Sequence, residues 1–406
     1  MTYQNYLDIE RAPHLDERGF LAILQSIAQQ ELGRGAPLAR PARPPREFGA
    51  GSWQDAGCDA DVLRAISERY ARMFHVRLDV PDLAARAEDL ADTALRLWRE
   101  GARPITFFTS GSTGMPKPCT HLEAHLRQEI TSIAPLLTGR RAALVTAPMH
   151  HMYGFTFGLL LPLTLDIPIR SCPPLPTVVF AQMRPGDMVV GIPLLWTRLV
   201  DVKGWAGQSS GEGEDIALIS ATAPLPAQVM SALMGQAFRV VEFFGASEMG
   251  AVCRRERPDM PFVLLPHVRR GTHNGEDVLQ RLLPDGELRS YPLLDNVAWM
   301  DHHSFYPQGR RDKAVQIGGV NVFPDHVAEV LQGHEGVREC SVRLMRPEEG
   351  HRLKAFVVPA PGWTAEALRP ALSAFVRKRL EDVLRPAAYA FGEELPCGPV
   401  GKPSDW

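Results

Sequence analysis

Short apolar runs separated by polar or turn-forming residues organise the middle of the chain. They cover residues 104–108, 142–146, 188–192, 217–220 and 240–244, and stretches with helical spacing of apolar residues lie between them. Strand-like runs that alternate with helices are typical of a sheet covered by helices. The pattern therefore predicts an α/β fold for residues 104–300.

The first hundred residues show less order. Residues 34–50 are rich in proline and arginine and are expected to be extended. Residues 60–100 carry apolar residues at helical spacing, among them Leu83, Ala87, Leu90, Ala91, Ala94, Leu97 and Trp98. Helices are expected there, but no recognisable motif occurs in this region.

A second pattern begins near residue 310. Strand-like runs at 314–317, 339–345 and 353–358 alternate with two amphipathic segments. One segment opens at Pro324, and the other carries Leu372, Phe375, Val376, Leu380 and Val383 and stops before Pro386. This predicts a large α/β domain over residues 1–310 and a small, mobile α+β domain over residues 311–406.

Composition excludes several classes of protein. The chain has 406 residues, is 45% hydrophobic and 22% charged, and has a net charge of −3, which argues against a nucleic-acid or anionic-membrane partner. The N-terminus has no secretory pattern, and the apolar stretch 155–169 is too short and interrupted to span a bilayer. The six cysteines are widely spaced, as expected of reduced thiols in a cytoplasmic protein.

Residues 109–118 (TSGSTGMPKP) carry the strongest chemical signal. Glycines let successive backbone N–H groups point inward, and hydroxyls and a lysine add donors, which suits a polyphosphate. The lysine follows Gly-Met-Pro, so the Walker A spacing of P-loop NTPases is absent. The candidate phosphate ligands are Thr109, Ser110, Gly111, Ser112, Thr113, Gly114 and Lys117; a flexible linker is the alternative interpretation.

This run resembles the phosphate loop of the adenylate-forming superfamily, which includes acyl-CoA synthetases. Further segments of the chain match the same family in the same order. The segment 241–250 (VEFFGASEMG) is similar to the family's Tyr-Gly-x-Thr-Glu motif. The resemblance implies that Glu248 lies beside Mg²⁺ and that Ser247 contacts phosphate or metal. It places Phe244 and Gly245, with Ala221 and Thr222 of the segment 220–225, beside the adenine, and Ala246 and Met249 at the substrate pocket.

The remaining matches lie toward the C-terminus. The resemblance implies that Asp295, fifteen residues before Arg310, grips the ribose together with that arginine, although Leu293-Leu294 replaces the usual Thr-Gly; Asp301 is an alternative acid with poorer spacing. It makes Asp312 the hinge between domains, assigns Gly318 and Gly319 to the pantetheine tunnel, and makes Lys402 the catalytic lysine. The amino-acid sequence of residues 318–324 is most similar to that of the phenylacetate-CoA ligase branch.

The segment 148–154 (PMHHMYG) resembles the family's acid-binding segment. The resemblance places His151 and Tyr153 at the acyl pocket, and one of the two adjacent histidines is expected to be a structural core residue. No aspartate occurs between residues 148 and 158, which disfavours an amino acid substrate. Ala221 and Thr222 narrow the pocket floor, which favours a small flat acid such as a hydroxybenzoate.

Taken with the resemblance, these features predict an ATP- and Mg²⁺-dependent ligase with His151, Glu248 and Lys402 as its catalytic residues. It would adenylate an aryl acid, release pyrophosphate and pass the acyl group to a thiol of CoA or of the phosphopantetheine arm of an acyl carrier protein. Two alternatives stay open, a nucleotide-binding pseudoenzyme without turnover and a kinase or NTPase.

Overall fold

The computed structural model describes residues 12–34, 51–109, 117–200, 216–293, 295–310, 314–318, 320–346 and 348–396. The side chains of Arg34, Thr109 and Arg310 are outside this description. The chain forms two compact units, a larger one built mainly from residues before 307 and a smaller one built mainly from residue 307 onward. The predicted fold class, a large α/β unit with a small α+β unit, is confirmed.

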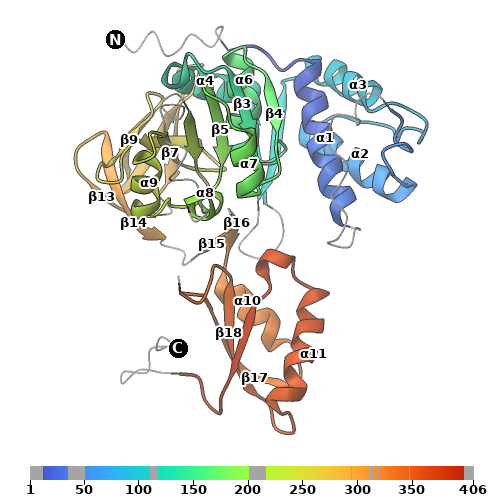
Figure 1. Ribbon diagram of the computed structural model, residues 1–406, viewed down its shortest axis with the longest axis vertical. Helices are drawn as coiled ribbons and strands as arrows, with labels where there is room; N and C mark the ends of the chain where they lie inside the picture. The colour runs from blue at the N-terminus through green and yellow to red at the C-terminus, as the bar shows by residue number, and fades with distance from the viewer. Residues whose placement is uncertain are drawn as a thin grey trace. The chain divides into compact units, whose positions relative to one another are not determined.

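A nine-stranded sheet is the centre of the larger unit, with strand order β13-β14-β9-β8-β7-β6-β5-β3-β4 (Figure 1). The strands β4, β3, β5, β6 and β7 run parallel to one another, whereas β8, β9 and β14 pair antiparallel. The bounds are β3 Ala142–Val145, β4 Ile169–Ser171, β5 Asp187–Gly191, β6 Ala217–Ser220, β7 Arg239–Ala246, β8 Gly250–Arg255, β9 Phe262–Leu264, β13 Asp295–Trp299 and β14 Ser304–Arg310. The strands expected at 142–146, 188–192, 217–220 and 240–244 are β3, β5, β6 and β7.

Alternate residues of the parallel strands enter two different apolar cores. On β3, Ala143 and Val145 face one core, while Leu144 faces the other. The second core holds side chains of α7 (Pro176–Gln182), α8 (Pro193–Val200) and α9 (Ala227–Met234). The first holds side chains of α4 (Glu123–Ile133) and of the helices that follow β3. Because both faces are covered, β3, β5 and β6 are buried along their whole length and read as continuous apolar runs.

The helices of the first hundred residues form an aromatic cluster continuous with the first core. They are α1 (Glu17–Arg34), α2 (Ala60–Phe74) and α3 (Ala87–Arg99). Phe20 of α1 stacks on Phe74 of α2 at 4.1 Å between ring centroids and lies 5.2 Å from Trp98 of α3. The helical spacing seen over 60–100 is therefore confirmed as two helices, and α1 is an element that the sequence patterns did not predict.

Two small sheets complete the larger unit. The first joins β1 (Pro104–Thr109) to β2 (Lys117–Leu122), the strands that flank the predicted phosphate loop. The second is antiparallel and contains β10 (Val268–His273), β11 (Glu276–Leu282) and β12 (Leu288–Pro292). The strand expected at 104–108 is β1.

The smaller unit packs two helices on a three-stranded sheet of order β17-β18-β19 (Figure 1). Its elements are β15 Val315–Ile317, β16 Val320–Val322, α10 Pro324–Gln332, β17 Val337–Leu344, β18 Leu353–Pro359, α11 Ala365–Arg377, a 3₁₀ turn η7 Asp382–Leu384 and β19 Ala388–Phe391. Pro324 opens α10 as expected. The second helix is shorter than expected, because α11 ends at Arg377 and leaves Leu380 and Val383 outside it.

Two further expectations concern cysteines and membrane spans. The five cysteines among the described residues are buried and free of disulfides, and Cys397 lies outside that part of the chain. Among the described residues, no helix combines the length and the apolar character that a membrane crossing needs.

A tightly packed helical segment follows β3 and carries residues of the predicted acid-binding segment. It consists of α5 (Met152–Phe155), a π-helical turn η5 (Thr156–Leu160) and α6 (Leu161–Thr164). A separate 3₁₀ turn, η4 (Ala134–Leu137), follows α4. A Cβ on Gly154 would lie 2.1 Å from the carbonyl oxygen of Pro148, and one on Gly158 would lie 2.6 Å from Cγ1 of Val145. Only glycine permits this close approach of the helix to the end of β3.

We predict that Gly154→Ala lowers the free energy of unfolding by at least about 2 kcal/mol, because the added methyl group meets backbone that cannot move aside. Chemical denaturation measures this change. Gly33→Ala is the matched control, since a Cβ there meets nothing within 4 Å, and it should stabilise α1 by up to about 1 kcal/mol. Equal stabilities of the two variants would contradict the packing assigned to Gly154.

Candidate functional site

The carboxyl ends of the parallel strands gather most of the predicted site residues of the larger unit at one edge of the sheet. His151 and Tyr153 follow β3, Ala221 and Thr222 follow β6, and Glu248 follows β7. Since β3, β5, β6 and β7 are consecutive neighbours and parallel, these segments leave the sheet on the same side. Open α/β sheets bind ligands outside this edge.

Glu248 lies at the tip of the hairpin that joins β7 to β8. Ala246 pairs with Gly250, so the loop consists of Ser247, Glu248 and Met249, and Met249 N–H donates to Ala246 O at 3.0 Å. The register shifts by one residue just below the loop, a bulge of the kind that re-aims side chains near binding sites. The Met249 side chain is buried in an apolar cluster with Val252 and Phe262.

Phe244 and Gly245 precede this tip. The ring of Phe244 lies 5.8 Å from that of Phe305 and 6.0 Å from that of Phe262, which fixes its plane. A Cβ on Gly245 would lie 2.3 Å from Gly250 O, so the hairpin closes only with glycine. The predicted adenine-side role of both residues stays a prediction.

The donor set fits a magnesium ion that is shared with substrate phosphates. Glu248 offers a hard carboxylate ligand, and no group of three or more His, Cys, Asp or Glu side chains suited to a metal occurs among the described residues. Mg²⁺ commonly takes one or two carboxylates together with phosphate oxygens and water, rather than a cage of protein ligands. Glu248 and the hydroxyl of Ser247 would hold such an ion, which would shield phosphate charge when bound.

His150 and His151 have different surroundings. His150 is buried and hydrogen-bonded to α1, through Nδ1 to Ser26 Oγ at 2.8 Å and through Nε2 to Gln30 Oε1 at 2.7 Å. It is therefore the structural histidine of the pair. The imidazole of His151 makes no hydrogen bond with the described residues, and its ring centroid lies 4.4 Å from that of His150.

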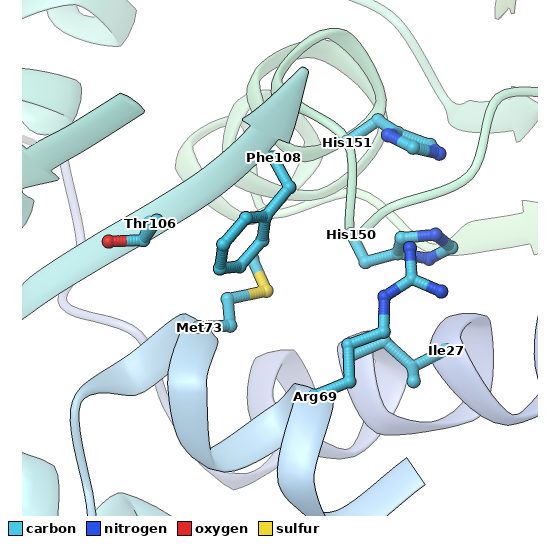
Figure 2. Close-up of a pocket in the computed structure, with 7 residues that line it drawn as sticks. All are labelled: Ile27, Arg69, Met73, Thr106, Phe108, His150 and His151. Atoms are coloured by element: carbon cyan, nitrogen blue, oxygen red, sulfur yellow. The ribbon is translucent and has the colours of Figure 1, made fainter. Parts of the chain in front are cut away.

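A small hollow that is partly open to solvent lies beside the two histidines (Figure 2). Its lining residues are Ile27, Arg69, Met73, Thr106, Phe108, His150 and His151. Figure 2 shows the ring of Phe108 and the side chain of Met73 together on one side, with Arg69 and the histidines opposite. Arg69 Nη1 donates to Glu31 Oε1 at 2.7 Å, so the hollow combines an apolar wall with a neutralised cation.

Five of these lining residues were not predicted from the sequence. Ile27 belongs to α1, Arg69 and Met73 belong to α2, and Thr106 and Phe108 belong to β1, which leads into the predicted phosphate loop. The usable signal was the position of Phe108 next to that loop. The residues of α1 and α2 reach the site only through tertiary packing.

Tyr153 is not among the residues that line the hollow. Its hydroxyl is 2.7 Å from Gly191 O and 2.8 Å from Ile219 O, at the ends of β5 and β6. Burial raises the pKa of this phenol well above its ordinary value. The tyrosine therefore ties two strand ends together as a neutral donor, and its contact with substrate stays a prediction.

The segment after β6 is conformationally strained. Thr222 has a φ of +76°, which a β-branched residue rarely adopts. Thr222 Oγ1 and the Oγ of the fully buried Ser220 are hidden from solvent and have no hydrogen-bond partner among the described residues. Strain and unsatisfied hydroxyls cluster at functional sites, and the predicted adenine contact of Ala221 and Thr222 stays a prediction.

The predicted ribose pair occupies two neighbouring strands. Asp295 begins β13 and Arg310 ends β14. A four-residue connection between neighbouring strands requires that they run in opposite directions, so the two residues lie at the same end of the pair. Asp301 is in the connection at the other end and accepts a hydrogen bond from His303 N–H at 2.7 Å. This placement favours Asp295 over Asp301 as the partner of Arg310.

Several predicted residues cannot be placed. Residues 110–116 of the phosphate loop, Asp312, Gly319 and Lys402 lie outside the described residues. Lys117 begins β2, and Gly318 follows β15 with a φ of +58° in the tight connection to β16. The roles of all these residues stay predictions.

Comparisons with known proteins identify the family of the chain. Residues 100–273 match the family model of the AMP-binding enzymes, and residues 326–402 match that of the AMP-binding enzyme C-terminal domain. A 4-coumarate–CoA ligase of Halorhodospira halophila is 33% identical over 399 residues, covering 94% of this chain and 97% of that protein. One from Rhodobacter capsulatus is 36% identical over 319 residues, covering 76% and 77%.

A solved structure shares the fold. The amide bond synthetase of Marinactinospora thermotolerans superposes with a TM-score of 0.64 over 99% of this chain and 98% of that chain, at 18% identity. The chain belongs to the AMP-binding, adenylate-forming enzyme family and is an acid–thiol ligase of that family. Because the Halorhodospira match covers 94% of the chain, most of the first hundred residues belong to the shared sequence as well.

We predict a pH-dependent loss of stability that depends on His151. Burial, and to a lesser extent the charge of Arg69, lowers the pKa of His151 from 6.5 to about 4. Between these values the unfolded chain binds the proton and the folded chain does not, so the free energy of unfolding falls as pH drops from 6.5 to 4. The share of His151 is at most about 3 kcal/mol. Urea denaturation at pH 7.5, 6 and 5 measures it.

His151→Gln should flatten this pH dependence relative to the wild-type protein. His302→Gln, at an exposed position of the 300–303 connection, is the control and should follow the wild-type curve. An unchanged slope in His151→Gln would contradict the neutral, half-buried state assigned to His151.

Proposed function

We propose that this ligase uses ATP to join an aromatic carboxylic acid of the hydroxycinnamate class to the thiol of CoA. The observation that carries the proposal is the hollow beside His151, with its aromatic and apolar wall. The names of the Halorhodospira and Rhodobacter relatives, both 4-coumarate–CoA ligases, support the same acid and the same acceptor.

The proposed reaction has two steps. The carboxylate of the acid attacks the α-phosphorus of ATP, and the bond to the bridging oxygen breaks to release pyrophosphate. The CoA thiol then loses its proton and attacks the acyl carbon, and AMP leaves with the bonding electron pair. In the first step the phosphate loop and Glu248 would offset phosphate charge, and Lys402 would stabilise the charge that develops between the two anions.

The lining of the hollow supports a small, flat acid, because it combines an aromatic and apolar wall with a few polar groups. A planar ring can lie against Phe108 and Met73 while its carboxylate approaches His151. The neutral imidazole can donate a hydrogen bond to that carboxylate, and the Arg69–Glu31 pair adds polarity without a net charge.

A hydroxybenzoate, the acid suggested by the sequence, is the competing aryl substrate, and a carrier-protein phosphopantetheine is the competing acceptor. A hydroxybenzoate could enter the same adenylation step, and a phosphopantetheine thiol could take part in the same transfer step. A hydroxybenzoate lacks the two-carbon spacer of a hydroxycinnamate, so it would fill less of the apolar wall. Mass spectrometry of the thioester formed with CoA, compared with a phosphopantetheinylated carrier protein, separates the acceptors, and CoA is the expected one.

Acid-dependent exchange of labelled pyrophosphate into ATP tests the proposed activity. Across 4-coumarate, 4-hydroxybenzoate, benzoate and octanoate, we expect 4-coumarate to give the highest kcat/KM, at least about tenfold above octanoate, because an apolar pocket discriminates by roughly this factor. Absence of exchange with every acid would indicate a nucleotide-binding protein without turnover. Release of ADP and phosphate would indicate an NTPase.

A substitution inside the hollow tests where the acid binds. Met73→Phe places a rigid ring in the space, and we expect the KM for 4-coumarate to rise about tenfold while the KM for ATP stays within about twofold. Met260→Phe, at a position that is 48% exposed, is the matched control and should leave both constants unchanged. Equal KM values for 4-coumarate in Met73→Phe and the wild-type protein would place the acid elsewhere.

A further inference from the structure

Three side chains from distant parts of the sequence hold the backbone of the Glu248 loop. Ser247, Met249 and Ala251 each exchange a backbone hydrogen bond with a side chain. The partners are His121 of β2, Arg281 of β11 and Glu129 of α4, in that order. Glu248 therefore lies in a loop whose main chain is fixed on both sides of it.

His121 connects the loop to the strand that follows the phosphate-binding run. Its Nε2 lies 2.7 Å from Ser247 O, and because a carbonyl only accepts, Nε2 carries the proton. Burial lowers the pKa of His121 to about 4, so the ring is neutral near pH 7. His121 and Lys117, the last of the predicted phosphate ligands, lie in the same strand, β2.

Arg281 and Glu129 form a buried ion pair on the other side of the loop. Each side chain is only 1% exposed, and Nη1 of Arg281 lies 3.4 Å from Oε2 of Glu129. Arg281 donates to Met249 O and, at 2.6 Å, to His125 O. Glu129 accepts from Ala251 N–H at 3.0 Å. The two charges are thus shared with the backbone on either side of Gly250.

Gly250 shows how closely the pair fits the loop. A Cβ at this position would lie 1.9 Å from Oε2 of Glu129, and the residue has a φ of +83°. The carboxylate occupies the space that any other side chain would need. The loop can therefore pack against the buried pair in this way only with glycine at position 250.

We propose that His121, Arg281 and Glu129 are positioning residues that hold the Ser247–Met249 loop so that the carboxylate of Glu248 is preorganised toward a magnesium-bound polyphosphate. The proposal rests on the proposed function, in which Glu248 meets the metal side of ATP. Residues behind a metal ligand commonly change metal affinity by 10–100-fold when they are removed. Neither Arg281 nor Glu129 is part of a sequence motif, and neither would contact substrate itself.

His121 offers the cleanest test, because removing one member of a buried ion pair leaves an uncompensated charge and endangers folding. In His121→Leu we expect the Kd for ATP in excess Mg²⁺ to rise at least about tenfold, measured by calorimetry without acid so that no turnover occurs. The Kd for ATP in EDTA should stay within about twofold, since only the metal-dependent part of binding uses Glu248. His121→Gln, which keeps an N–H donor, should recover most of the loss.

His125→Leu is the matched control. His125 lies in the first turn of α4, just after β2, and its ring is close to the charge of Arg281, but only its backbone carbonyl takes part in the network. This variant should bind ATP as the wild-type protein does. Arg281→Lys, which keeps the charge and loses the forked donor, should give an intermediate loss and provides a second measurement if His121→Leu does not fold.

Comparison with Glu248→Gln separates failure of this inference from failure of the proposed function. If Glu248→Gln weakens Mg²⁺-dependent binding and neither His121→Leu nor Arg281→Lys does, the positioning role is wrong and the proposed function stands. If Glu248→Gln has no effect, the metal role of Glu248 in the proposed function is wrong, and the positioning role that depends on it is wrong as well. Equal losses with Mg²⁺ and in EDTA would indicate general damage to the nucleotide site and would overturn the positioning role.

Discussion

The parallel alignment of β3, β5, β6 and β7 is the constraint on which the arrangement of the site depends. It sends the segments after β3, β6 and β7 to one edge of the sheet, although they are separated by tens of residues in the chain. Helices cover both faces, so β3, β5 and β6 are buried along their whole length, and residues 240–243 of β7 are buried as well. Residues that are far apart in the sequence are thereby brought to one edge of the sheet.

Close backbone packing turns this edge into a defined shape. Gly154 allows the helix after β3 to approach Pro148, Gly245 closes the β7–β8 hairpin, and Gly250 leaves room for the Glu129 carboxylate. At each position a methyl group would overlap atoms that belong to the backbone or to a buried ion pair. At the same edge Thr222 has a strained backbone conformation, and the Ser220 and Thr222 hydroxyls have no hydrogen-bond partner among the described residues. Close packing of this kind reduces the ordering cost of binding for the segments that it holds.

The larger part of the fold could be predicted from local pattern. The strands β3, β5 and β6 are short and buried along their whole length, so each contains an apolar run, and Pro324 marks the start of α10. The predicted α11 was too long, because Leu380 and Val383 keep helical spacing after the helix has ended at Arg377 and pack in the same core. The helix α1 was missed, since its apolar positions follow no clear helical stripe and its burial comes from α2 and α3.

The sequence alone identified the family, and it predicted the chemistry through the phosphate loop at 109–118, the carboxylate of Glu248 and the spacing of Asp295 and Arg310. Such features are local, because one short segment supplies each group of donors or acceptors. Tertiary structure decided which histidine is structural, since Ser26 and Gln30 of α1 bind His150 and leave His151 at the hollow. It also brought Arg281 and Glu129 beneath the Glu248 loop. A buried ion pair joins residues 152 positions apart, and no periodicity along a chain can encode a contact that only the packing of separate elements creates.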